Sequence, residues 1–242
     1  MIREIAALPP LPDDSDAAVK IAAQVRAYGL SRPFLRAYAG EGGSVLSVLD
    51  GAATLYPGQD ADEALLFVRM SPDVGSLRTD APTAGRFAAS IGVTAVIGVT
   101  MEYRGDPVAI DPVGSLTPRD AYPLLLAVFG ETLPLYDVWY ADVSHRLRHG
   151  VCRIAGVTEQ GQAVSCAMTV AETETAWVIG AVATHPDFRG RGYASAAVRS
   201  LVAEGQAQGK RVLISPKNEA ARALYERLGF AARGTWGAVQ WN

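Results

Sequence analysis

Cysteine and histidine are scarce in this sequence of 242 residues, which contains two cysteines and three histidines. Cys152 and Cys166 lie in two strand-like runs, form no C-x-x-C pair and have no zinc-type spacing to histidine. We therefore expect two buried, reduced thiols in a cytoplasmic protein, with no disulfide framework and no metal site.

The sequence also lacks an excess of positive charge. Lysine and arginine total 22 against 25 aspartates and glutamates, so the formal net charge is −3. General nucleic-acid-binding proteins usually carry a basic surplus, and we expect no nucleic-acid partner here.

No long hydrophobic run is present. The longest apolar stretch, Phe87 to Met101, is interrupted by glycine and threonine and is too short to cross a bilayer. The beginning, "MIREIAALPPLPDD", has no basic segment followed by an apolar one, so no secretory signal is expected. Because 49% of the residues are hydrophobic and 19% are charged, a sizeable core and no membrane partner are predicted.

The chain divides near a segment rich in proline and glycine, Arg104 to Asp120, which is typical of a linker. We predict two lobes, residues 1–112 and 113–242. In the first lobe we expect helices at 15–28, 33–38 and 83–90, and strand-like runs at 44–57, 63–72 and 92–103.

The second lobe has clearer signals. Helices are predicted at 117–130, 136–150, 192–208 and 218–230, the last with Asn218 as its N-cap and Gly229 at its end. Three strands are expected as a meander between 151 and 186, a short buried strand at 210–216, and a final strand pair between Ala231 and Trp241.

The stretch "HPDFRGRGYAS", residues 185–195, joins a predicted strand to a predicted helix. A helix N-terminus offers unpaired N–H groups to a phosphate, glycines allow close approach, and Arg189 and Arg191 can pair with phosphate oxygens. The spacing fits neither the dinucleotide pattern G-x-G-x-x-G nor a P-loop. A sharp turn with solvated arginines is the plainer alternative.

The pattern Arg189-x-x-Gly192-x-Ala194 matches the signature Gln/Arg-x-x-Gly-x-Gly/Ala of the GNAT superfamily of acyl-CoA-dependent N-acyltransferases. "VIGAVATHP", "RVLISP" and "NEAARALYERLGF" also follow one another as in that family. From about Ser115 to Asn242 the chain therefore resembles the GNAT superfamily, and is most similar to the subgroup of glycine N-acyltransferase-like C-terminal domains.

The resemblance implies an α/β (α+β) fold, with a mixed, mostly antiparallel twisted sheet flanked by helices. It implies transfer of an acetyl group from acetyl-CoA to a small primary amine by direct attack, with no metal. Tyr225 would then protonate the leaving thiolate as the catalytic acid. The cofactor-binding residues implied are Val182, Ala183 and Thr184, whose backbone would pair with pantetheine, the pyrophosphate loop Arg189, Gly190, Arg191, Gly192, Tyr193 and Ala194, and Asn218.

Several alternatives stay open at this point. Tyr225 can instead be a core aromatic and Asn218 a plain N-cap, and the protein can be an acyl-CoA-binding sensor without catalysis. Glu172 and Glu174 are candidate bases, but as turn residues they are more typical of a protein surface. The first lobe is reminiscent of a degenerate GNAT half that lacks the phosphate loop. The amine acceptor is undefined, and a homodimer is compatible with the sequence.

Overall fold

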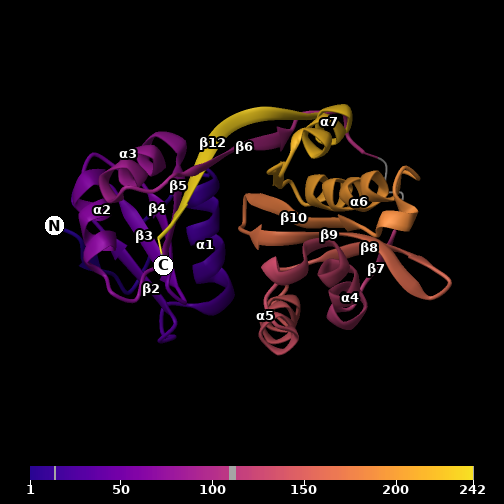
Figure 1. Cartoon of the computed structure of the whole chain (residues 1–242), viewed down its shortest axis with the longest axis horizontal. Helices are drawn as coiled ribbons and strands as arrows, with labels where there is room; N and C mark the ends of the chain where they lie inside the picture. The colour runs from indigo at the N-terminus through magenta and orange to yellow at the C-terminus, as the bar shows by residue number, and fades with distance from the viewer. Residues whose placement is uncertain (14, 109–112, 242) are drawn as a thin grey trace. The chain divides into compact units, whose positions relative to one another are not determined.

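The computed structural model describes residues 1–13, 15–108 and 113–241, and the chain divides into two compact units (Figure 1). Unit 1 comprises Met1–Thr100 and Ala232–Asn242, and unit 2 comprises Met101–Ala231. The sequence places its boundary between 112 and 113 instead. Residues 109–112 of the predicted linker lie outside the described residues.

Unit 1 combines short strands with three helices. The strands are β1 (Arg3–Glu4), β2 (Leu35–Ala39), β3 (Val45–Leu49), β4 (Ala52–Tyr56) and β5 (Ser76–Asp80), and the helices are α1 (Asp16–Tyr28), α2 (Ala61–Met70) and α3 (Ala81–Ile91). Neighbours from β1 to β4 are antiparallel, whereas β4 and β5 are parallel and joined by the crossover helix α2. Helix α1 covers one face of this sheet, and α2 and α3 cover the other (Figure 1).

Two predictions in unit 1 were wrong. Residues 33–38 were expected to be helical, but they contribute to β2, which pairs with β3 along its whole length. Residues 63–72 were expected to be a strand, but most of them belong to α2. The buried positions Ala61, Ala64, Leu65 and Val68 follow the helical period, which an unbroken apolar run conceals.

Unit 2 is a mostly antiparallel sheet with helices on both faces. Its strands are β7 (Gly114–Ser115), β8 (Ile154–Glu159), β9 (Gln162–Glu172), β10 (Ala176–Thr184) and β11 (Arg211–Ile214). Its helices are α4 (Pro118–Phe129), α5 (Tyr136–Arg148), α6 (Tyr193–Ala207) and α7 (Glu219–Arg227), with short 3-10 turns at Gly130–Thr132 and Pro186–Phe188. The predicted fold class and the predicted helices of this part are confirmed.

The parallel pair of unit 2 is β10 and β11, connected by α6. Strands β7 to β10 pair antiparallel with their neighbours. Helix α6 lies on one face of this sheet and α4 and α5 on the other (Figure 1). The side chains alternate accordingly: Cys166 and Met168 of β9 pack in a cluster with Leu125 of α4 and Val143 of α5.

Two strands pass from one unit to the other. β6 (Val96–Tyr103) begins in unit 1, and its residues Met101 and Glu102 pair antiparallel with β11 of unit 2. β12 (Phe230–Gln240) begins in unit 2, and its residues Trp236 to Gln240 pair antiparallel with β5 of unit 1. The predicted final strand pair is therefore wrong, because residues 230–240 form one long strand.

Two adjacent leucines of α4 offer a test of the unit 2 core. Leu125 is fully buried, whereas Leu126 is 46% exposed. We expect Leu125→Ala to lower the free energy of unfolding by about 2–5 kcal/mol, because it leaves a cavity in a packed core. Leu126→Ala should change it by less than about 0.5 kcal/mol. Urea unfolding followed by circular dichroism measures both, and equal effects would contradict this packing.

Candidate functional site

The site in unit 2 begins where two parallel strands separate. β10 and β11 pair from Ala176–Arg211 to Ile179–Ile214, and no pairing between them continues beyond that point among the described residues. β10 runs on to Thr184, and its register with β9 shifts between Gly180 and Ala183, where Ala181 has a φ of 47°. Such a bulge bends a strand and leaves main-chain groups without ladder partners.

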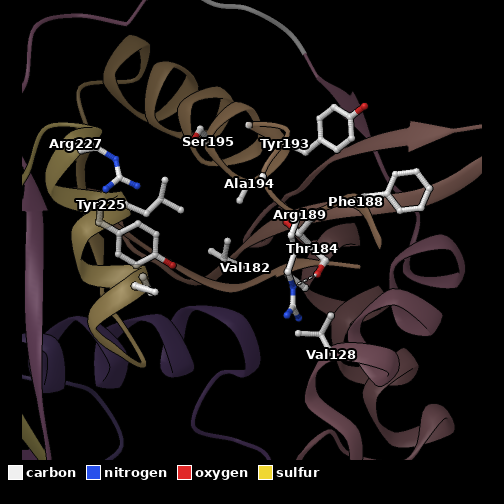
Figure 2. Close-up of a pocket in the computed structure, with 16 residues that line it drawn as sticks. Val128, Val182, Thr184, Phe188, Arg189, Tyr193, Ala194, Ser195, Tyr225 and Arg227 are labelled. Atoms are coloured by element: carbon white, nitrogen blue, oxygen red, sulfur yellow. Dashed lines mark hydrogen bonds between the residues drawn. The ribbon is translucent and has the colours of Figure 1, made fainter. Parts of the chain in front are cut away.

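A pocket of about 550 Å³ opens at this separation (Figure 2). It lies among the end of β10, the loop that follows, the start of α6 and one face of α7. The lining residues are Val128, Val182, Ala183, Thr184, Phe188, Arg189, Gly190, Gly192, Tyr193, Ala194, Ser195, Ala220, Ala221, Leu224, Tyr225 and Arg227. The structure thus brings most of the predicted site residues into one pocket, although in the sequence they are spread from the end of β10 to α7.

The 189–192 loop turns the chain sharply into α6. Gly190 and Gly192 have φ values of 77° and 81°, in the left-handed region that only glycine adopts without strain. From Gly190 to Ser195, the N–H groups have no hydrogen-bond acceptor in the described part of the chain. This run of donors at the positive end of a 15-residue helix is a natural anion site.

Arg189 adds a positive charge beside these donors. Its Nε donates to the carbonyl oxygen of Thr184 at 3.3 Å, which ties the loop to the end of β10 (Figure 2). Thr184 is anchored in turn, because its hydroxyl lies 2.8 Å from that of Ser165 on β9. The cation therefore stays at the pocket with part of its guanidinium group available for an anion.

Tyr193 ties the first turn of α6 to the β8–β9 hairpin. Its hydroxyl donates to a carboxylate oxygen of Glu159, the last residue of β8. This hydrogen bond raises the pKa of Tyr193, because the phenol loses its favourable bond and gains a second negative charge nearby on ionisation. Hydrogen bonds to the main chain of Thr184 and to the side chain of Glu159 thus fix the two ends of the 189–192 loop.

Tyr225 closes the pocket from α7. Its side chain is 5% exposed and extends toward Val182 (Figure 2). Burial raises the pKa of Tyr225 to about 12, because the phenolate would lose its hydration. No hydrogen bond joins its hydroxyl to another described residue, so this neutral donor is available to a ligand.

Two predicted residues lie outside the lining. Asn218 caps α7, and its Oδ1 accepts from the N–H of Ala221 at 2.9 Å. Arg191 lies over the ring of Phe188 at 5.0 Å and donates to the carbonyl oxygen of Asp187 at 3.4 Å. The N-cap prediction for Asn218 is confirmed, and a ligand role for either residue stays a prediction.

Sequence reasoning missed several lining residues. On α7, Ala220, Leu224 and Arg227 follow the spacing i, i+4, i+7, so the helical period together with Tyr225 could have indicated this face. Val128, at the end of α4, carries no comparable signal because its contact with the pocket depends on packing between distant segments.

The two candidate bases differ in their surroundings. Glu172 is buried, accepts a hydrogen bond from Thr169 and forms an ion pair with Arg153, which also pairs with Glu204 at 2.6 Å. The expectation that Glu172 is a surface residue was therefore wrong, whereas Glu174 is exposed as expected. Neither residue lines the pocket.

The part of the chain that the structure describes holds no group of three or more His, Cys, Asp or Glu side chains arranged for a metal ion. None of its helices combines the length and apolar character needed to cross a membrane. Burial raises the pKa of Cys152 to about 11 and that of Cys166 to about 12, so both are thiols at neutral pH.

Comparison with known families gives one match within unit 2. Residues 119–230 match the model of the acetyltransferase (GNAT) family, a range that contains the whole pocket. The predicted resemblance to that superfamily is confirmed, and the subgroup stays a prediction. A search of curated proteins gives no match.

Solved structures resemble the chain over almost its full length. A GCN5-related N-acetyltransferase from Sphaerobacter thermophilus is 18% identical, with a TM-score of 0.60 and coverage of 99% of this chain and 95% of that one. An acetyltransferase of the GNAT family from Colwellia psychrerythraea is 12% identical, with a TM-score of 0.60 and complete coverage of both chains. A tandem GNAT protein from the clavulanic acid biosynthesis pathway is 16% identical, with a TM-score of 0.59 and coverage of 99% and 98%. At these identities the likeness shows the fold alone, and it fits an arrangement of two similar lobes.

The Glu172–Arg153 pair allows a stability test with a near neighbour as control. We expect Glu172→Ala to lower the free energy of unfolding by about 2 kcal/mol or more, because Arg153 and Thr169 lose a buried partner. Glu174→Ala, two residues away and exposed, should cost less than about 0.5 kcal/mol. Urea denaturation of the two variants decides the point, and a neutral Glu172→Ala would remove the structural role.

Proposed function

Because residues 119–230 belong to the acetyltransferase (GNAT) family, we propose that this protein transfers an acetyl group from acetyl-CoA to a small primary amine. The family match supports acyl transfer from an acyl-CoA in general. The observation that carries the finer proposal is the meeting, in one pocket, of an unpaired strand end, a row of free N–H donors and a buried neutral phenol.

The free N–H groups from Gly190 to Ser195, together with Arg189, are suited to the pyrophosphate of coenzyme A. These donors carry partial positive charge, and they lie at the start of a helix whose dipole adds to the attraction. The preceding residues, Val182 to Thr184, lie beyond the last β10–β11 pair. Their main-chain groups on that side can pair with the amide-rich pantetheine arm as an added strand would.

This placement would bring the thioester to the base of the pocket, between β10 and Tyr225. A main-chain N–H of β10 there would polarise the carbonyl as the amine nitrogen attacks its carbon. The new C–N bond forms, the C–S bond breaks, and the sulfur leaves with the bonding electron pair. Holding amine and thioester together supplies much of the rate, because the reaction becomes effectively unimolecular.

Tyr225 would donate its proton to the departing sulfur. Its phenol is un-ionised at neutral pH and its hydroxyl makes no competing bond to a described residue. The amine must lose a proton in the same process. Among the described lining residues there is no carboxylate and no histidine, so we propose that this proton passes to water.

The experiment that tests the proposal is release of free thiol from acetyl-CoA with a panel of small amines. We expect Tyr225→Phe to lower kcat by roughly 100-fold, because a positioned proton donor is lost, while the Kd of acetyl-CoA stays unchanged. Tyr38→Phe, a buried tyrosine of unit 1, serves as the matched control and should keep full activity.

Two results would contradict this assignment. Unchanged kcat in Tyr225→Phe would remove the phenol from proton transfer. Binding of acetyl-CoA without thiol release from any amine would instead favour an acyl-CoA sensor that uses the same pocket.

The raised pKa of Tyr225 gives a second prediction. A general acid works below its pKa, so a phenol with a pKa of about 12 stays active at higher pH than an ordinary tyrosine, whose pKa is about 10. We expect ionisation of Tyr225 to cause no decrease in kcat between neutral pH and about pH 10. Any decrease in that range should therefore also be seen in Tyr225→Phe. A decrease in kcat centred near pH 10 that is present in the wild type and absent in Tyr225→Phe would show that the phenol is not buried from water in the working enzyme.

A further inference from the structure

Helix α2 of unit 1 is the crossover between β4 and β5, as α6 is between β10 and β11. Helix α6 begins with glycine and open N–H groups, whereas α2 begins with Asp60, Asp62 and Glu63. The carboxylate of Asp60 already accepts from the N–H groups of Gly42 and Ser44, at 2.9 and 3.0 Å. The start of α2 is therefore acidic and is unsuited to a pyrophosphate.

The outward face of α2 carries large apolar side chains. Leu66 is 58% exposed and Met70 is 73% exposed, although the opposite face of the helix is buried in the unit 1 core. Met1 is also exposed, and its ammonium group lies 3.2 Å from the carboxylate of Glu63 on the same helix. Single exposed apolar residues are ordinary, but several on one surface are typical of an interaction site.

A hollow of about 240 Å³ lies beside these side chains, between α2 and α3. The two helices cover the same face of the unit 1 sheet (Figure 1). Leu65 and Phe87 are the buried part of the lining, and the exposed part consists of Asp62, Leu66, Arg69, Arg86 and Ser90. Such a hollow, apolar inside and charged at its rim, can accept an apolar side chain of a partner.

The charges of α2 are separated along the helix axis. Asp62 lies in the first turn and Arg69 in the last turn. They are seven residues apart, which is close to two full turns, so they share a face with Leu66 between them. Asp62 lies 3.6 Å from Arg86 of α3, whereas Arg69 forms no ion pair within the part of the chain that the structure describes. The exposed face thus has a negative end, an apolar centre and an unpaired positive end.

We propose that this α2–α3 face binds a second copy of the chain, with the two α2 helices antiparallel. A twofold interface uses the same patch on both copies, so the patch must be complementary to itself. In the antiparallel arrangement Leu66 meets Leu66 of the second copy, and Asp62 of each copy lies opposite Arg69 of the other. A parallel arrangement would instead bring like charges together. A helix with an acidic end, an apolar centre and a basic end is what this face requires of a partner, and α2 itself has that order.

The size of the face indicates how strong the dimer should be. Helices α2 and α3 have 10 and 11 residues, so each is about 15 Å long. A face two helices wide and of this length is at the small end of specific protein interfaces. We therefore expect a dimer that dissociates on dilution. Its formation is independent of the acyl transfer proposed for unit 2, because no residue of this face lines the unit 2 pocket.

Sedimentation equilibrium of the full chain, from low to high micromolar concentration, tests the proposal. We expect the wild type to dimerise as its concentration rises. Leu66→Glu should weaken dimerisation by roughly 100-fold, because two carboxylates would meet at the centre of the interface. Leu126→Glu is the matched control, since it makes the same change at an exposed leucine of α4 in unit 2. This variant should dimerise like the wild type.

A charge exchange tests the antiparallel arrangement. Asp62→Arg and Arg69→Asp should each be largely monomeric alone, because each brings like charges together in its own dimer. An equal mixture of the two variants should form a heterodimer, in which both opposed pairs carry opposite charges. These positions are exposed, so the variants should fold, and thermal unfolding followed by circular dichroism checks this.

Three results would each overturn the proposal: a wild type that stays monomeric throughout, a dimer that Leu66→Glu leaves unchanged, or single-charge variants that do not associate when mixed. Acetyl-CoA affinity and thiol release measured on Leu66→Glu test the unit 2 site independently.

Discussion

The separation of two parallel strands is the constraint on which the rest of the structure depends. In a sheet, each main-chain N–H and C=O needs a partner, and a strand that leaves its neighbour exposes a row of these groups. β10 does so after Ile179 and β4 does so after Thr54, and a pocket follows in each case. The crossover helices α6 and α2 follow from the same geometry, because parallel neighbours cannot be joined by a tight turn.

The two units share this framework, and local charge distinguishes their chemistry. At the start of α6, left-handed glycines and Arg189 present donors and positive charge. At the start of α2, acidic residues take the same place. One backbone arrangement thus presents different charges in the two units, and fold alone does not choose the ligand.

The sequence predicted the part of the site that depends on local chemistry. Gly190 and Gly192 belong to a turn that can be recognised within a few residues. Tyr225 was predicted from the resemblance to the GNAT superfamily, and it lies on a helix whose N-cap, Asn218, the sequence also indicates. The prediction from sequence was wrong where pairing between distant segments determines the secondary structure. Residues 33–38 were expected to be helical, but Leu35–Ala39 form a strand that pairs with β3. The burial of Glu172 likewise depends on a distant partner, Arg153, which lies just before β8.

β6 and β12 each have residues in both units, and this affects how the chain folds during synthesis. A ribosome releases the N-terminal segment first, and domains generally fold as they emerge. In unit 1, however, β5 pairs with residues Trp236 to Gln240 of β12, so its edge stays open until almost the whole chain has been made. An unpaired edge is a template for aggregation. For the same reason, cutting the chain near its middle yields an N-terminal fragment without its last strand.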